Sequence, residues 1–218
     1  MDPVAGLSRN EIFRREFSSG PDVDRTAFFS DAVFAIAMTL LAVEIQVPQV
    51  HDRELGRAVA GQLPQFLAYV LSFVVTGAFW QSHHRMFRVL RGFTSGLQRL
   101  NLVLLLFVAL IGYATDMLAF YGHTALGVAV YAGALGIIGA VDSLMWLYCS
   151  RQGLFREGYD ARLLARAWLH AGIAPAVFLL SVPVAFLFGP DAAKLSWLAI
   201  LAIEVPLNFR GRKPLPAV

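Results

Sequence analysis

Long apolar runs constrain this chain more than any other feature of its sequence. A transmembrane helix needs about 20 predominantly apolar residues. Hydrophobic residues make up 57% of the 218 and charged residues only 15%, whereas soluble domains carry about 25% charged residues. The sequence therefore predicts an all-α, polytopic membrane protein with six transmembrane helices. The six apolar runs lie near residues 26–47, 62–84, 98–120, 124–149, 164–188 and 194–209.

Basic residues alternate between dense and sparse connections along the chain. Fifteen of the 18 Lys and Arg residues fall in the two terminal segments and in the second and fourth connections, whereas Arg53, Arg57 and Lys194 fall in the other three. Lys and Arg concentrate on the cytoplasmic side of membrane proteins. Both termini are therefore predicted to be cytoplasmic. This placement explains the net charge of +3 without a nucleic-acid partner.

The same pattern predicts three parts of the chain. The N-terminal part lacks the apolar core and cleavage site of a secretory signal, so we expect it to be retained. No internal duplication is visible, so one chain supplies one copy of whatever it builds. The expected parts are a polar cytoplasmic segment at 1–24, a six-helix transmembrane domain at 25–209 and a basic cytoplasmic tail at 210–218.

The first apolar run carries charge at its start and an aliphatic stripe further along. Placing the charged Asp31 side chain in a membrane costs free energy unless it has partners inside the protein. At about 100° per residue, Ile36, Leu40 and Val43 share one narrow stripe, and Asp31 projects from nearly the opposite side. Around a shared axis, such stripes would form hydrophobic rings that gate by dewetting. Packing against lipid or a neighbouring helix is the commoner use of a stripe, and geometry alone favours it.

A motif in this run resembles a known family. The sequence reads Arg-x-x-x-Phe-Ser-Asp from Arg25 to Asp31, which resembles the signature of the endolysosomal potassium channel family, transmembrane protein 175, and of its bacterial homologues. Trp80 and His84 at the end of the second run and Asn101 at the start of the third are similar to the family's residues there. The last three runs match only in hydropathy.

The resemblance implies a six-helix subunit whose first helix lines a potassium-permeable pore. The family lacks the carbonyl filter of ordinary potassium channels, and this sequence contains no Thr-Val-Gly-Tyr-Gly loop. Carried over by position, the pore-lining sites fall on Ile36, Leu40 and Val43 as aliphatic rings and on Thr39 as a hydroxyl ring. Animal channels of the family resemble two such units fused in one chain. The single motif here therefore implies a bacterial-type homotetramer in the cell membrane, with K⁺ as the transient permeant ion.

The resemblance also implies a polar network beside the pore. Arg25, Ser30, Asp31, Trp80 and His84 match the family's interhelical or intersubunit hydrogen-bond cluster. The residues alone support this interpretation, because a carboxylate pointing away from the stripe needs donors, and indole, guanidinium and imidazole groups supply them. A structural role is favoured over ion coordination, because charges within membranes pair internally.

The remaining residues do not indicate a metal-binding or catalytic function. With a single cysteine, Cys149, the chain has no Cys/His metal cluster, and the adjacent His83 and His84 point about 100° apart, so they do not jointly grip a metal. We expect no cofactor and no resident metal. The motifs H-E-x-x-H and G-x-S-x-G are absent, so an enzyme is not expected.

A second function stays open at this point. A proton-coupled secondary transporter would use an intramembrane aspartate, Asp142 or Asp31, as its titrating site. The roles of Asp142, Asp116, Glu44 and Glu204 also stay open. They could be functional, in proton coupling or, for Glu44 and Asp116, in attracting cations at the outer mouth, or they could form hydrogen bonds between helices.

Overall fold

The computed structural model describes residues 23–156 and 161–200, and this part of the chain is helical apart from one isolated bridge between Leu90 and Phe155. The predicted all-α class is therefore confirmed. The helices are α2 (Val23–Val43), α3 (Asp52–Gly61), α4 (Leu63–Arg88), α5 (Ser95–Ala109), α6 (Ile111–Tyr121), α7 (Ala125–Arg151), α8 (Ala161–Leu187) and α9 (Pro190–Ser196).

Four helical segments within the described residues are long and apolar enough to cross a membrane. They are Val23–Val43, Leu63–Arg88, Ser95–Tyr121 and Ala125–Arg151, and α8 contributes a shorter apolar stretch, Ala171–Leu187. These segments overlap the first five predicted runs. Most of the sixth run, together with Glu204 and the terminal segments, lies outside the described residues. The count of six spans stays a prediction.

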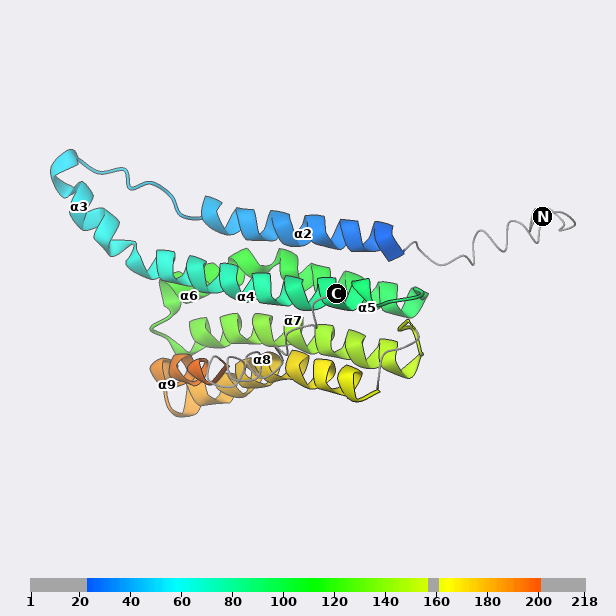
Figure 1. Cartoon of the computed structure of the whole chain (residues 1–218). Coiled ribbons are helices and arrows are strands. Elements are labelled where there is room, and N and C mark those ends of the chain that lie inside the picture. Colours follow the sequence, from blue (N-terminus) through cyan, green and yellow to red (C-terminus); the bar gives the residue numbers. More distant parts are fainter. Residues whose placement is uncertain (1–22, 157–160, 201–218) are drawn as a thin grey trace, which may run out of the picture.

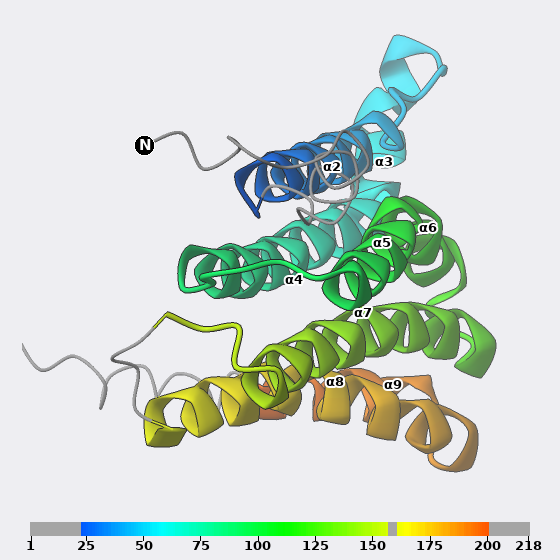
Figure 2. The same ribbon diagram turned by 90° about the vertical axis from the view of Figure 1, so that its right-hand side faces the viewer.

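The helices stack in layers (Figure 1). Helix α2 packs on α4, α5 and α6, and α7 packs between that layer and the pair α8 and α9. Figure 2 shows the same order from the side, with α2 on the outside of the stack. Within the described residues, α2 is therefore covered on one side only.

Two features of the helices were not expected from the sequence. The first connection contains α3, a ten-residue helix with Asp52 and Glu54 in its first turn, where carboxylates favour the positive end of a helix. The third span is interrupted at Leu110, whose N–H donates to the Phe107 carbonyl over 3.1 Å as α5 ends and α6 begins. Other ends follow ordinary capping: the Thr94 hydroxyl accepts from the N–H of Leu97, as N-cap side chains do.

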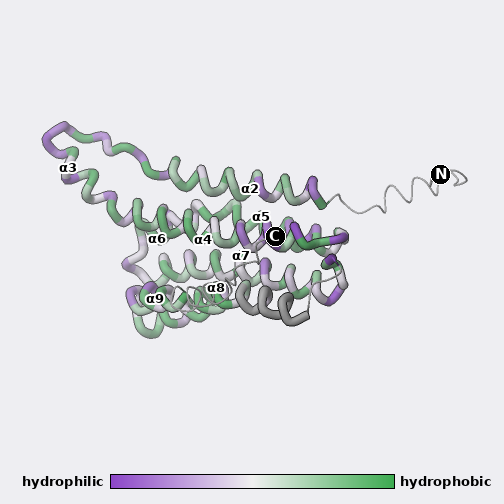
Figure 3. The backbone as a smooth tube through the Cα atoms, in the orientation of Figure 1, coloured by the Kyte–Doolittle hydropathy of each residue, from purple (hydrophilic) through white to green (hydrophobic). Residues whose placement is uncertain are grey.

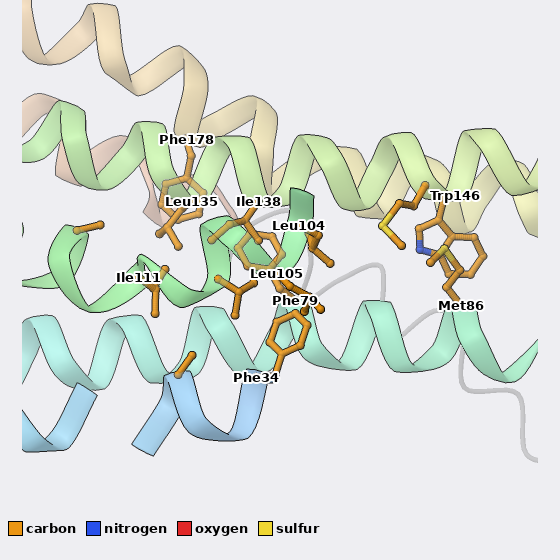
Figure 4. Packing of buried hydrophobic residues seen from close by; sticks show 14 of the residues in the cluster. Phe34, Phe79, Met86, Leu104, Leu105, Ile111, Leu135, Ile138, Trp146 and Phe178 are labelled. Carbon is orange, nitrogen blue, oxygen red and sulfur yellow. The ribbon is translucent and has the colours of Figure 1, made fainter. Parts of the chain in front are cut away.

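The apolar core lies between the layers. Phe34 of α2, Phe79 of α4 and Phe178 of α8 are almost fully buried, and Figure 4 shows them with the leucines and isoleucines of α5, α6 and α7 between them. Small residues allow close approach on α7, where a Cβ added to Gly139 would lie 2.8 Å from Pro175 of α8. Such close approach is how helices associate in lipid, where the hydrophobic effect does not drive them together.

The two ends of the bundle differ in charge. Polar segments collect at the ends and apolar ones between them (Figure 3). One end gathers the starts of α2, α5 and α8 with the ends of α4 and α7 (Figure 1). Its described charged side chains are those of Asp24, Arg25, Arg85, Arg88, Arg91, Arg99, Arg151 and Arg156. The opposite end, which we call the acidic end, carries Glu44, Asp52, Arg53, Glu54, Arg57, Asp116, Asp191 and Lys194.

Candidate pore face and its polar anchors

Helix α2 has two contrasting faces. One face packs into the bundle through Ser30, Phe34, Ala37 and Leu41, all of which are buried. The other face is uncovered within the described residues: Ile36 is 57% exposed, Leu40 51% and Val43 68%. The aliphatic stripe is therefore separate from the surface that joins α2 to its own subunit. We call Ile36, Thr39, Leu40 and Val43 the stripe face.

The stripe face includes one hydroxyl. Thr39 is exposed, and its Oγ1 donates a hydrogen bond to the backbone oxygen of Ile36 over 2.9 Å. The hydroxyl proton is therefore used within the helix, while the oxygen lone pairs stay available to a cation or to water. Ile36 and Val43 lie about 10 Å apart along the axis at 1.5 Å rise per residue. Helix α2 ends at Val43, four residues before the end of the predicted run.

Asp31 turns away from the stripe face and toward α4. The indole N–H of Trp80 donates to Asp31 Oδ1 over 2.8 Å, and His84 Nδ1 lies 3.6 Å from Asp31 Oδ2. The rings of Trp80 and His84 also contact each other, with centroids 5.5 Å apart. Two side chains of α4, one turn apart, therefore hold one carboxylate of α2.

Ser30 enters a second, fully buried network. Asn101 of α5 donates from Nδ2 to Ser30 Oγ over 2.9 Å, and its Oδ1 lies 2.9 Å from His83 Nε2. Because Oδ1 can only accept, His83 donates from Nε2. The His83 ring packs between Phe34 and Phe87, with centroids 5.6 and 4.4 Å away. This network joins α2, α4 and α5 at a single asparagine.

The structure thus divides the expected polar cluster into two. Asp31, Trp80 and His84 come together, whereas Ser30 joins His83 and Asn101, whose pairing the sequence interpretation missed. The signal for that pairing was Asn101 itself, an uncharged polar residue in a run of leucines. Arg25 is exposed at the start of α2, and no contact between the described residues joins it to Asp31.

The other acidic residues occupy separate places. The charge of Glu44, just after α2, reaches Asp116 of α6 and repels it electrostatically. Asp142 is buried between α7 and α4, with its Oδ2 bonded to Ser82. Within residues 23–156 and 161–200, no group of three His, Cys, Asp or Glu side chains could hold a metal ion, and Cys149 is buried as a free thiol.

Comparison with known proteins places these features in a family. The family described as endosomal/lysosomal potassium channel TMEM175 matches residues 25–111, which contain the stripe face and both networks. A potassium channel of Streptomyces collinus is 34% identical over 174 residues, which cover 76% of this chain and 84% of that protein. The chain belongs to the TMEM175 family. It is therefore a multi-pass membrane protein of an ion channel family.

A solved structure and a more distant relative extend the comparison. The crystal structure of a lysosomal potassium-selective channel TMEM175 homologue from Chamaesiphon minutus matches with a TM-score of 0.73 and 25% identity, covering 85% of this chain and 98% of that one. The human endosomal/lysosomal proton channel TMEM175 is 34% identical over 107 residues, which are 45% of this chain but only 21% of the human protein. The similarity to the Streptomyces and Chamaesiphon proteins therefore covers most of this chain and most of each of theirs.

Proposed function

We propose that this chain is one subunit of a potassium channel, in which the stripe faces of four copies surround a central pore and K⁺ passes down its gradient. The observation that carries the proposal is the division of α2 into two faces. One face is fixed to the subunit by polar contacts, and the opposite face presents Ile36, Leu40 and Val43 without cover. No cofactor or resident metal takes part.

The polar anchors support placing the stripe face at an axis rather than in lipid. Ser30 and Asp31 are neighbours in sequence, so their side chains leave α2 about 100° apart. Ser30 is held by α5 and Asp31 by α4, and together they fix the rotation of α2 about its own axis. Acyl chains are indifferent to that rotation, whereas rings of side chains around a pore depend on it.

The rings themselves supply a gate and one polar level. Branched side chains at Ile36, Leu40 and Val43 would form a constriction that water leaves when it is narrow. The Thr39 oxygens would provide acceptors at the level between Ile36 and Leu40, where a K⁺ ion loses part of its hydration shell. Potassium is the ion we propose because the Streptomyces relative, which matches over most of its length, is named a potassium channel.

Orientation follows from the charge of the two ends. The end that gathers Arg85, Arg88 and Arg151 would face the cytoplasm by the positive-inside rule, together with both termini. The acidic end, with Glu44 and Asp116, would face outward and attract cations to the pore mouth. Residues 194–209 would complete six spans in the cell membrane.

Flux measurements test the function directly. The purified protein in K⁺-loaded liposomes should give passive K⁺ efflux that follows the membrane potential and needs no pH gradient. Its mass in detergent should equal four subunits. Efflux that requires a proton gradient and stops in Asp142→Asn would instead indicate the proton-coupled transporter, and a stable monomer would contradict the shared pore.

A further inference from the structure

Asp142 is a buried carboxyl group that the pore does not use. It lies in α7 with 2% of its surface exposed. Ser82 of α4 donates from Oγ to Asp142 Oδ2 over 2.6 Å, and Trp146 Nε1 donates to the same Ser82 oxygen over 3.4 Å. Figure 4 shows Trp146 directed from α7 toward α4. The second oxygen, Oδ1, is buried and has no hydrogen-bond partner within the part of the chain described.

The surroundings offer this carboxyl little to balance a negative charge. From α4, Arg85 is the charged side chain whose field reaches Asp142, but it is exposed and its Nε donates to the Gln81 carbonyl over 3.2 Å. From α5, the charged side chain is Arg99, which is also exposed and donates to the Ser95 carbonyl. With one neutral donor and no bonded cation among the described side chains, a buried carboxylate at this position is strongly disfavoured relative to its protonated form.

Among the side chains that the structure describes, the remaining neighbours of α7 place no compensating charge near Asp142. Residues 171–187 of α8 contain no titratable side chain. Helix α6, which carries Asp116, and helix α9, which carries Asp191 and Lys194, lie toward the opposite end of the bundle from the end of α7 (Figure 1). Asp191 and Lys194 pair with each other over 2.7 Å. Arg151, at the end of α7, is exposed and lies about two and a half turns beyond Asp142.

We propose that Asp142 is a proton-binding site inside each subunit, occupied by a proton in the arrangement described, and that loss of this proton opens the contact between α7 and α4. The ionised carboxylate would need a donor at Oδ1, and the described residues supply none in the closed contact. The site differs from Asp31: Trp80 and Ser82 leave α4 about 200° apart, so α4 lies between Asp31 of α2 and Asp142 of α7.

The position of Asp142 connects its protonation state to the stripe face through contacts between helices. Helix α4 anchors α2 through Trp80, and Asp142 anchors α4 to α7 through Ser82. Opening the second contact would free α4 to move with α2. The proton site itself is independent of the proposed pore, whereas its effect on flux rests on the proposed function.

Infrared spectroscopy of the protein in lipid tests the site without any flux measurement. The C=O stretch of a protonated carboxyl is distinct from the bands of a carboxylate. At neutral pH we expect a protonated-carboxyl band that disappears in Asp142→Asn and persists in the matched control Asp116→Asn. In Ser82→Ala, which removes the donor to the carboxylate, the band should persist to higher pH than in the wild type. A neutral-pH spectrum that Asp142→Asn leaves unchanged would overturn the proposal.

Stability and flux provide separate readouts. Because the folded protein holds the proton and the unfolded chain releases it at neutral pH, the thermal stability contributed by this site should fall as pH rises, until the folded group also ionises. That fall should be absent in Asp142→Asn, and an identical pH dependence in both proteins would contradict the site. If the band and the stability change appear but no variant conducts K⁺, the proton site stands and the proposed channel function fails.

Discussion

The indole N–H of Trp80 reaches across from α4 to Asp31 of α2 and donates a hydrogen bond over 2.8 Å. This contact joins the helix that carries the stripe face to the rest of its subunit. His84, one turn further along α4, lies beside the other carboxylate oxygen. The carboxylate thus holds α2 in place, and it points away from Ile36 and Leu40.

Removing the carboxylate should therefore affect assembly before it affects the permeating ion. In Asp31→Ala, the Trp80 N–H loses its acceptor and α2 loses one of its two rotational constraints, so the proposed tetramer should dissociate in detergent. Asp31→Asn keeps an acceptor oxygen for Trp80 and should retain more of the tetramer. Size-exclusion chromatography with mass determination measures both. Intact Asp31→Ala tetramers with normal flux would contradict this role.

Replacing Asn101 should lower stability, because this one buried side chain bonds to two others. Asn101→Leu leaves the buried Nε2–H of His83 without its acceptor, which costs about 1–3 kcal/mol. Ser30 loses the Asn101 donor but keeps its hydrogen bond to the Thr26 carbonyl. Thermal unfolding in detergent should show a clear loss, whereas Leu102→Ala, at an exposed position on the same helix, should change little. The double variant Ser30→Ala with Asn101→Ala should lose less than the sum of its parts. Additive losses would show that the two residues do not act together.

Two glycines of α7 provide a matched test of the packing against α8. A Cβ at Gly139 would lie 2.8 Å from Pro175 and 2.9 Å from Phe79, whereas a Cβ at Gly133 meets nothing within 4 Å. Overpacking costs about 1–3 kcal/mol, so Gly139→Ala should lower the unfolding temperature. Gly133→Ala should be neutral or slightly stabilising, since alanine favours a helix by up to about 1 kcal/mol over glycine. Equal effects in the two variants would argue against the close contact of α7 with α8.

Much of this arrangement could be predicted from periodicity and charge. The spacing of Ile36, Leu40 and Val43 placed them on one face, and the cost of a membrane-embedded carboxylate indicated that Asp31 has partners in the protein. The expected polar cluster grouped Ser30 with Asp31, and this expectation was incomplete for a physical reason. Hydropathy does not show which helices become neighbours, so the pairing of Ser30 with Asn101 and His83 depended on tertiary packing.

Other features were hidden for different reasons. Helix α3 is too short and too charged to resemble a span, and the interruption at Leu110 has no proline to mark it. A pore formed by several chains depends on a symmetry axis, which neither the sequence nor one subunit contains. From geometry alone the stripe face was an apolar surface best explained by packing against lipid or a neighbouring helix, and the interpretation as a pore came from the family resemblance.

Wetting the proposed constriction should increase leak. Ile36→Asn replaces a branched hydrocarbon ring with amides that hold water, so a dewetted gate should become permeable. We expect K⁺ efflux from liposomes to rise several-fold over the wild type, with no rise in Val74→Asn. Val74 is a suitable control because it is as exposed as Ile36, at 62% against 57%, but lies on α4. Equal leak in both variants would indicate general damage to the bilayer seal.

The most direct test asks whether water in the conduction path reaches Ile36. Cysteines placed at Ile36 or Val74, in a Cys149→Ser background, would be treated with a charged, water-soluble thiol reagent while K⁺ flux is recorded. The proposed pore predicts that Ile36→Cys channels lose their flux as the reagent reacts and that Val74→Cys channels do not. Undiminished flux through fully modified Ile36→Cys protein would show that the stripe face does not line the path of the ion.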